Sequence, residues 1–149
     1  MKNNFVFFIL IMCFFQNLKA DNLNIQSTNI SIDKKTEITI FKNKVEARDE
    51  EGNIFKTNYA EYNKNLKSLE SKGDTTITTS EGFSISGENI KFDNKNKLIS
   101  SKFNATINDL ENNTIYLENF TYSTVDKFFK SNGNIKVFDS QNNSYKFSQ

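Results

Sequence analysis

The chain has 149 residues, enough for one domain behind a processing segment and too few for a multidomain enzyme. Its 36% hydrophobic residues can build a core, while 19 basic and 18 acidic residues leave a formal charge of +1, which argues against nucleic-acid binding by bulk charge. Histidine is absent and cysteine occurs once, which excludes histidine bases, Cys/His metal sites and disulfide frameworks. We therefore expect a binding protein and not an enzyme, without a cofactor and without a metal site.

The first 20 residues have the three-part order of a secretory signal peptide. Lys2 gives a basic start, residues 5–15 form an unbroken apolar run, and a polar stretch leads to a cleavage site after Ala20. The alternative is an uncleaved anchor, but a spanning helix needs about 20 apolar residues and this run is shorter. We predict a signal peptide over 1–20 and one exported domain over 21–149.

Apolar and polar residues alternate along most of the remaining chain. A period of two is typical of antiparallel strands with one buried and one solvated face. Turns rich in Asn, Asp and Gly separate the alternating runs at intervals of roughly 8–14 residues, which predicts an all-β sandwich, barrel or rolled sheet. The side chains predicted to face inward are Ile38, Ile40, Val45, Ala47, Phe83, Ile85, Ile90, Phe92, Phe103, Ile107, Ile115, Leu117, Ile135 and Val137.

Two further features concern repetition and the last strand. Residues 45–49 resemble 135–139, with 89–93 about midway, which suggests a loose repeat near 45 residues.

The chain ends at 145–149 in mid-alternation, and an exposed final strand is a template for pairing. We expect either that another chain supplies the next strand or that the sequence is the front of a longer protein.

Four segments together carry a family resemblance. Residues 41–49, 52–57 and 60–62, followed by 131–137, resemble the motifs of the OstA-like (organic-solvent-tolerance) domain of lipopolysaccharide transport. The likeness covers roughly 29–149. It is nearest to the N-terminal periplasmic domain of the outer-membrane lipopolysaccharide-assembly protein, with the periplasmic bridge component next. The resemblance implies a β-jellyroll, a rolled V-shaped antiparallel sheet that stacks edge to edge with other jellyrolls.

One position departs from the family pattern. Asn43-Lys44 stands where the family usually has Gly-Asn, so we expect Asn43 to adopt a left-handed conformation there.

The resemblance also implies a function. It predicts a periplasmic protein, associated with the outer membrane if the chain is the front of a longer one, that shelters the acyl chains of lipid A in its inward groove. Its partners would be lipopolysaccharide and other jellyrolls of the bridge, with the outer membrane as an indirect partner and no nucleic acid. Alternation alone favours an interior that is packed shut, and the alternative function is therefore an exported structural or adhesive β-domain with protein partners only.

Overall fold

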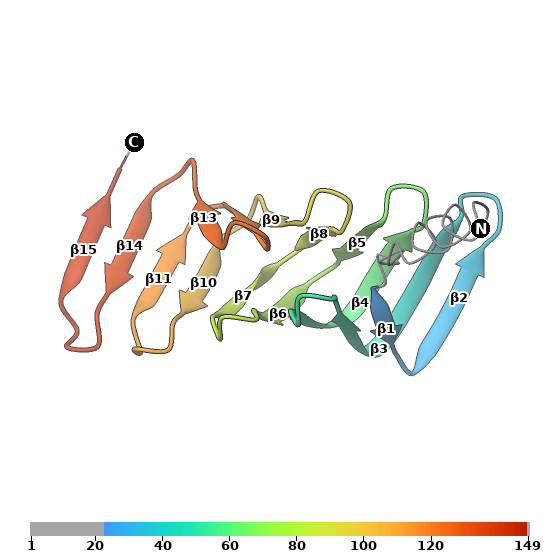
Figure 1. Ribbon diagram of the computed structural model, residues 1–149, viewed down its shortest axis with the longest axis horizontal. Helices are drawn as coiled ribbons and strands as arrows, with labels where there is room; N and C mark the ends of the chain where they lie inside the picture. The colour runs from blue at the N-terminus through green and yellow to red at the C-terminus, as the bar shows by residue number, and fades with distance from the viewer. Residues whose placement is uncertain (1–22, 149) are drawn as a thin grey trace, which may run out of the picture.

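The computed structural model describes residues 23–148, so the predicted signal peptide lies outside the described residues. Within this range every regular element is a β-strand, and all strands join one antiparallel sheet (Figure 1), which confirms the all-β prediction. The strands are β1 (Asn24–Gln26), β2 (Asn29–Asp33), β3 (Ile38–Arg48), β4 (Ile54–Asn63), β5 (Ser68–Ser71), β6 (Asp74–Thr78), β7 (Ser84–Glu88), β8 (Lys91–Asp93), β9 (Leu98–Ser101), β10 (Ala105–Asn108), β11 (Thr114–Leu117), β12 (Phe120–Ser123), β13 (Phe128–Lys130), β14 (Ile135–Phe138) and β15 (Ser144–Phe147).

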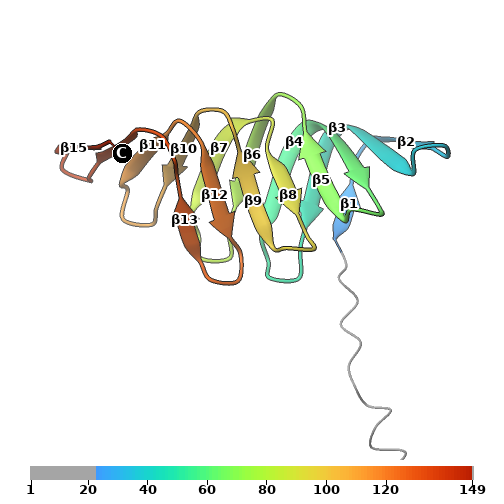
Figure 2. The ribbon, with the colours of Figure 1, turned by 90° about the horizontal axis from the view of Figure 1, so that it is seen from above.

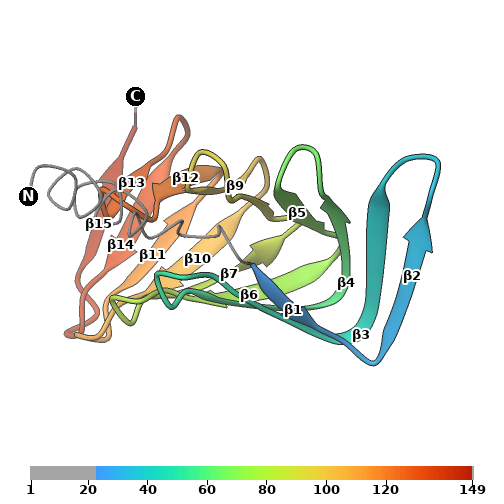
Figure 3. The same cartoon turned by 45° about the vertical axis from the view of Figure 1, so that its right-hand side comes forward.

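The sheet is folded into a V (Figure 3), with one wing lying in front of the other when seen from above (Figure 2). The long wing consists of β6, β7, β10, β11, β14 and β15, and the short wing consists of β5, β8, β9, β12 and β13. The first half of β4 pairs with β6 and its second half with β5, so β4 runs through both wings. Its neighbour β3 does the same, and β1 and β2 pair with the two halves of β3.

The crease of the V forms where the chain passes from one wing to the other. In β3, Asn43 and Lys44 both have positive φ values, 62° and 53°, and the register with β4 shifts there. The left-handed conformation predicted for Asn43 is therefore confirmed, and it extends to Lys44. This bulge bends the strand, as β-bulges generally do, and Phe41 before it and Val45 after it are both buried in the core.

The structure repeats every 30 residues, and each repeat contributes one hairpin turn to each wing. The spacing is visible in the first residues of the turns, which lie 30 residues apart along each wing. A repeat near 45 residues is therefore wrong: that comparison joined segments that are three repeats apart. The turns of the long wing begin at Asp49, Thr79, Asp109 and Asp139, and those of the short wing at Asp33, Asn63, Asp93 and Ser123.

Turn chemistry explains why the repeat persists with few identical residues. In the turn after β10, the Asp109 carboxylate accepts hydrogen bonds from the backbone and side-chain amides of Asn113 at 2.8 and 2.7 Å. The same pair of bonds recurs between Asp49 and Asn53 and between Asp139 and Asn143. Such Asx bonds satisfy the backbone of the turn locally, so the strands between can vary.

Candidate functional site

The interior face of the long wing is largely apolar. Cross-strand pairing places one residue from each strand in a row, and each row runs along the whole wing because partners in register share a face. The row nearer the turns consists of Ile25, Ala47, Phe55, Ile77, Ile85, Ile107, Ile115, Val137 and Tyr145. The row nearer the crease consists of Val45, Thr57, Thr75, Gly87, Ala105, Leu117, Ile135 and Phe147.

The short wing contributes a facing row that is more aromatic. Leu69, Phe92, Ile99 and Tyr122 are cross-strand neighbours and are all buried, and Phe129 continues the row. The rings of Tyr122 and Phe129 are stacked with centroids 4.4 Å apart.

In the middle of the V, the long-wing row nearer the turns is packed against the facing row of the short wing. The void between Phe55 and Ile77 of the long wing and Phe92 and Ile99 of the short wing measures only about 10 Å³. Such a space holds no ligand. The middle therefore has the packed interior that alternation alone favoured.

An open groove lies at the C-terminal end of the chain. At this end β14 and β15 extend beyond the short wing (Figures 1 and 2). The volume of the groove is about 600 Å³, and its lining includes the cross-strand neighbours Ala105, Leu117, Ile135 and Phe147 together with Tyr116. Ala105 and Leu117 are only 4% and 6% exposed, so the apolar surface open to a ligand comes mainly from Ile135, Phe147 and Tyr116. Polar groups at its border include Glu118, Asn134 and Lys146. The open groove and the packed interior thus occur in one molecule, at different places along the V.

The N-terminal end also exposes apolar side chains on the interior face. Ile30 and Ile32 of β2 are 58% and 67% exposed, and pairing places Ile30 beside the buried Phe41. Because β2 and β15 lie at opposite ends of the long axis (Figure 1), the apolar interior face is solvent-exposed at both ends of the molecule.

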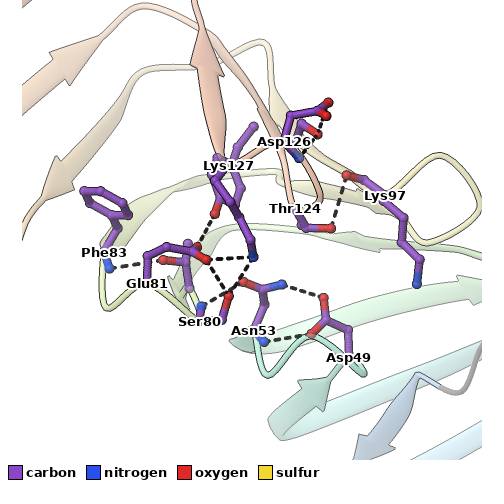
Figure 4. Close-up of polar contacts among 12 residues, drawn as sticks. Asp49, Asn53, Ser80, Glu81, Phe83, Lys97, Thr124, Asp126 and Lys127 are labelled. Atoms are coloured by element: carbon purple, nitrogen blue, oxygen red, sulfur yellow. Dashed lines mark hydrogen bonds and ion pairs between the residues drawn. The ribbon is translucent and has the colours of Figure 1, made fainter.

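Polar residues close the mouth of the V opposite the crease. In the turn after β6, the Glu81 carboxylate lies 2.8 Å from Nζ of Lys127, which belongs to the turn after β12 (Figure 4). Lys127 also donates to Ser80 Oγ at 2.8 Å, and the Tyr122 hydroxyl donates to Glu81. Burial alone would raise the pKa of Glu81, but these bonds outweigh it and lower that pKa to about 2.

A second ion pair joins the wings one repeat earlier. Lys97 Nζ lies 3.4 Å from Glu51, and both residues occupy the positions that Lys127 and Glu81 hold in the next repeat. We call these two ion pairs, with Ser80 and Tyr122, the clasp. The clasp holds the turns of one wing against those of the other, so the middle of the V is closed at its mouth as well as packed inside.

Most of the predicted inward positions face the interior. Val45, Ala47, Ile85, Ile90, Phe92, Ile107 and Leu117 are buried in the core, and Phe83, Ile115 and Ile135 pack against it. Val137 is half-buried in the same row as Ile115.

Three of the predicted positions are wrong. Phe103 is 52% exposed because it lies in the three-residue link between β9 and β10, where the chain turns at the crease. Ile38 and Ile40 lie on the outer face, because the strand that buries Phe41 and Val45 must expose the alternate residues.

Several interior residues were missing from the prediction. Four of them are at most 4% exposed: Phe55, Ile77, Leu69 and Tyr122. Each lies in a run where polar residues or a turn interrupt the alternation. Leu69 is equivalent to Ile99, which the prediction also lacked. The 30-residue spacing of the turns would have found the other three, since each occupies the position of a recognised inward residue one repeat away. Tyr122, for example, is equivalent to Phe92.

Residues 23–148 contain no helix long and apolar enough to cross a membrane. In the same range, no group of three or more metal-binding side chains comes together.

Comparison with family models gives no match, and neither does comparison with curated proteins. Among solved structures, the chain is similar to the crystal structure of LptH from Pseudomonas aeruginosa, described as the LptA homologous periplasmic component of the conserved lipopolysaccharide transport device. The TM-score is 0.65 at 14% sequence identity, and the match covers 87% of this chain and 96% of that chain. This likeness establishes an LptA-like jellyroll fold and confirms the fold that the sequence motifs implied.

Proposed function

We propose that this protein is a non-enzymatic component of lipopolysaccharide transport in the periplasm, and that its C-terminal groove shelters lipid A acyl chains. The observation that carries the proposal is the groove at the C-terminal end, whose accessible apolar lining includes Ile135 and Phe147, in a jellyroll of the LptA type. The role of LptH as a transport component supports it, as do the sequence motifs of 41–62 and 131–137.

The size and lining of the groove suit an acyl chain. Its 600 Å³ falls within the range of about 300–1,000 Å³ common for ligand pockets. Each CH₂ group that leaves water contributes about 0.8 kcal/mol, so about a dozen carbons would contribute on the order of 10 kcal/mol before ordering costs. That is enough to hold a lipid chain outside a membrane.

The proposal also assigns partners and a location. The predicted signal peptide at 1–20 would export the chain to the periplasm. The edges of β2, β13 and β15 would pair with other jellyrolls by strand addition, and this would connect the protein to the outer membrane indirectly. The near-neutral charge of the chain gives nucleic acid no electrostatic attraction.

Site-specific photocrosslinking in cells tests the groove. A photoreactive residue at Ile135 or Phe147 should capture lipopolysaccharide, whereas one at Glu70, which is exposed on the outer face of β5, should not. A third position, the buried Ile85, probes the packed middle and should also capture none. Capture at Glu70 but not in the groove would contradict the proposal.

The alternative function, an exported structural or adhesive β-domain, is favoured by the packed middle between Phe55 and Phe92. It predicts that groove positions crosslink only to protein. The same experiment therefore separates the two functions.

A further inference from the structure

The two wings end unevenly, and this unevenness bears on how two copies could join. Beyond β4 the long wing has six strands, β6, β7, β10, β11, β14 and β15, whereas the short wing has five, β5, β8, β9, β12 and β13. At the other end, β3 carries one further strand in each wing, β1 in the long wing and β2 in the short wing. If two copies simply met end to end, the long wing would therefore carry one strand too many.

The 30-residue repeat identifies the surplus strand. β1 (24–26) and β15 (144–147) hold the same position within their repeats, since they are four repeats apart. β1 lies on the edge of β3, where the preceding repeat would place its own last strand. Among residues 23–148, β1 therefore occupies the site that β15 of another copy would fill.

From this equivalence the geometry points to a strand exchange: β15 of one copy replaces β1 of the next copy on β3, while β2 of that next copy pairs with β13. This inference rests on the edge-to-edge assembly proposed above and adds its register and its built-in competitor. Without β1, each wing has six strands between β4 of one copy and β3 of the next, because β2 of the next copy is the sixth strand of the short wing. All pairs stay antiparallel, as in the rest of the sheet.

The side chains of β15 fit the position better than those of β1. In the register of β1, Tyr145 would take the place of Ile25 beside Ala47, and Phe147 would take the place of Ser27 beside Val45. Tyr145 and Phe147 are 49% and 56% exposed in the single copy, so the exchange covers apolar surface that is otherwise in water.

Charge on the outer face supports the same register. Lys136 and Lys146 are direct cross-strand partners, and like charges directly opposite each other are destabilising. In the proposed joint, Lys146 takes the place that Gln26 of the next copy holds opposite Glu46 of that copy. The carboxylate of Glu46 then lies beside the lysine pair and reduces the repulsion between Lys136 and Lys146.

In the short wing, Ile32 of the next copy would lie beside Phe129. This repeats the way in which Phe92 lies beside Leu69 and Tyr122 beside Ile99. Ile32 is among the most exposed apolar side chains of the single copy, and the joint would cover it.

Intermolecular crosslinking tests the exchange on the full chain in a Cys13→Ser background. Lys146→Cys protein is mixed with Glu46→Cys protein and treated with a short bifunctional thiol reagent, and we expect a crosslinked dimer. Lys146→Cys mixed with Gln26→Cys gives a dimer only if β1 stays in place, and Lys136→Cys mixed with Gln26→Cys only if β15 leaves instead. A dimer from either of the last two mixtures overturns the exchange but keeps edge-to-edge assembly. No dimer from any mixture overturns the exchange and any other edge-to-edge pairing between copies of this chain, and leaves the lipid groove to the photocrosslinking test.

A charge reversal gives a second readout. Lys146→Glu should weaken self-association by about two- to fivefold, the range expected for one cross-strand ion pair, and Glu46→Lys on the partner copy should restore it. Lys95→Glu, in the turn after β8, is the matched control and should have no effect. If Glu46→Lys fails to restore association, Lys146 does not face Glu46 and the register is wrong.

Discussion

The ammonium group of Lys127 lies 2.8 Å from the carboxylate of Glu81, and this ion pair joins the turn after β12 to the turn after β6. The two residues belong to different wings, so the contact depends on the V being closed. Both side chains are about two-thirds buried, which makes the pair less screened than one on the open surface.

Lys127→Met should therefore lower the free energy of unfolding by about 1 kcal/mol, because Glu81 and Ser80 lose a charged donor. Denaturant unfolding followed by circular dichroism measures this loss. Lys95→Met, in an exposed short-wing turn, serves as the control and should change stability by less than about 0.5 kcal/mol. Equal effects of the two substitutions would show that the clasp does not hold the wings together.

The low pKa of Glu81 predicts how the clasp responds to acid. Its folded value of about 2 lies below the ordinary 4.5, so its contribution to stability is complete above pH 4.5 and is lost as the pH falls from 4.5 to 2. The stability difference between the wild type and Glu81→Gln should accordingly shrink over this interval. Unfolding curves of both proteins at a series of pH values measure this difference. The other carboxylates contribute equally to both proteins, so their titration cancels in it. A difference that stays constant from pH 7 to pH 2 would contradict the assignment.

Ile77 lies in the packed middle and is fully buried. Ile77→Ala should cost about 2–5 kcal/mol, because it removes apolar contacts and leaves a cavity between Phe55 and Ile85. Leu66→Ala, in the exposed turn after β4, should cost less than about 0.5 kcal/mol. Thermal or denaturant unfolding compares the two, and a small cost at Ile77 would mean that the wings are not packed there.

The repeat makes a prediction about Gly52, whose φ is +89°. Asn112 and Asn142 hold the equivalent turn positions with φ of 64°, and the space around Gly52 admits a Cβ atom, since Ser80 is 3.9 Å away. Gly52→Asn should therefore be nearly neutral. Gly52→Val should cost at least about 1–2 kcal/mol, because a β-branched residue is strained in the left-handed region. Comparable stabilities of the two variants would contradict this account of the turn.

The sequence was sufficient to predict the strands and most of the interior face. Alternation identified Ile85, Ile107 and Leu117 as inward because their strands are regular, and the turn residues marked where those strands end. Alternation gave the wrong parity for residues 38–42, where Ile38 and Ile40 compete with Phe41 for the inward face. The structure resolves this competition through the pairing of Phe41 with the buried Ala60.

The site itself depends on features that no single strand reveals. Whether an apolar face is packed or open depends on what lies opposite, and Ile135 is only half-buried on β14, near the end of the sheet where the short wing has one strand fewer. Phe92 has the same alternation but faces Phe55 across the V. The clasp could not be predicted from local sequence either, since Lys127 and Glu81 belong to different wings and meet only in the folded protein.

The 30-residue periodicity also makes the length of this fold modular. Each unit adds two strands to each wing, and at a strand spacing of about 4.8 Å it extends the molecule by about 10 Å without altering its cross-section. Gaining or losing whole units would therefore change the length of the protein in fixed steps and leave the structure of both ends intact.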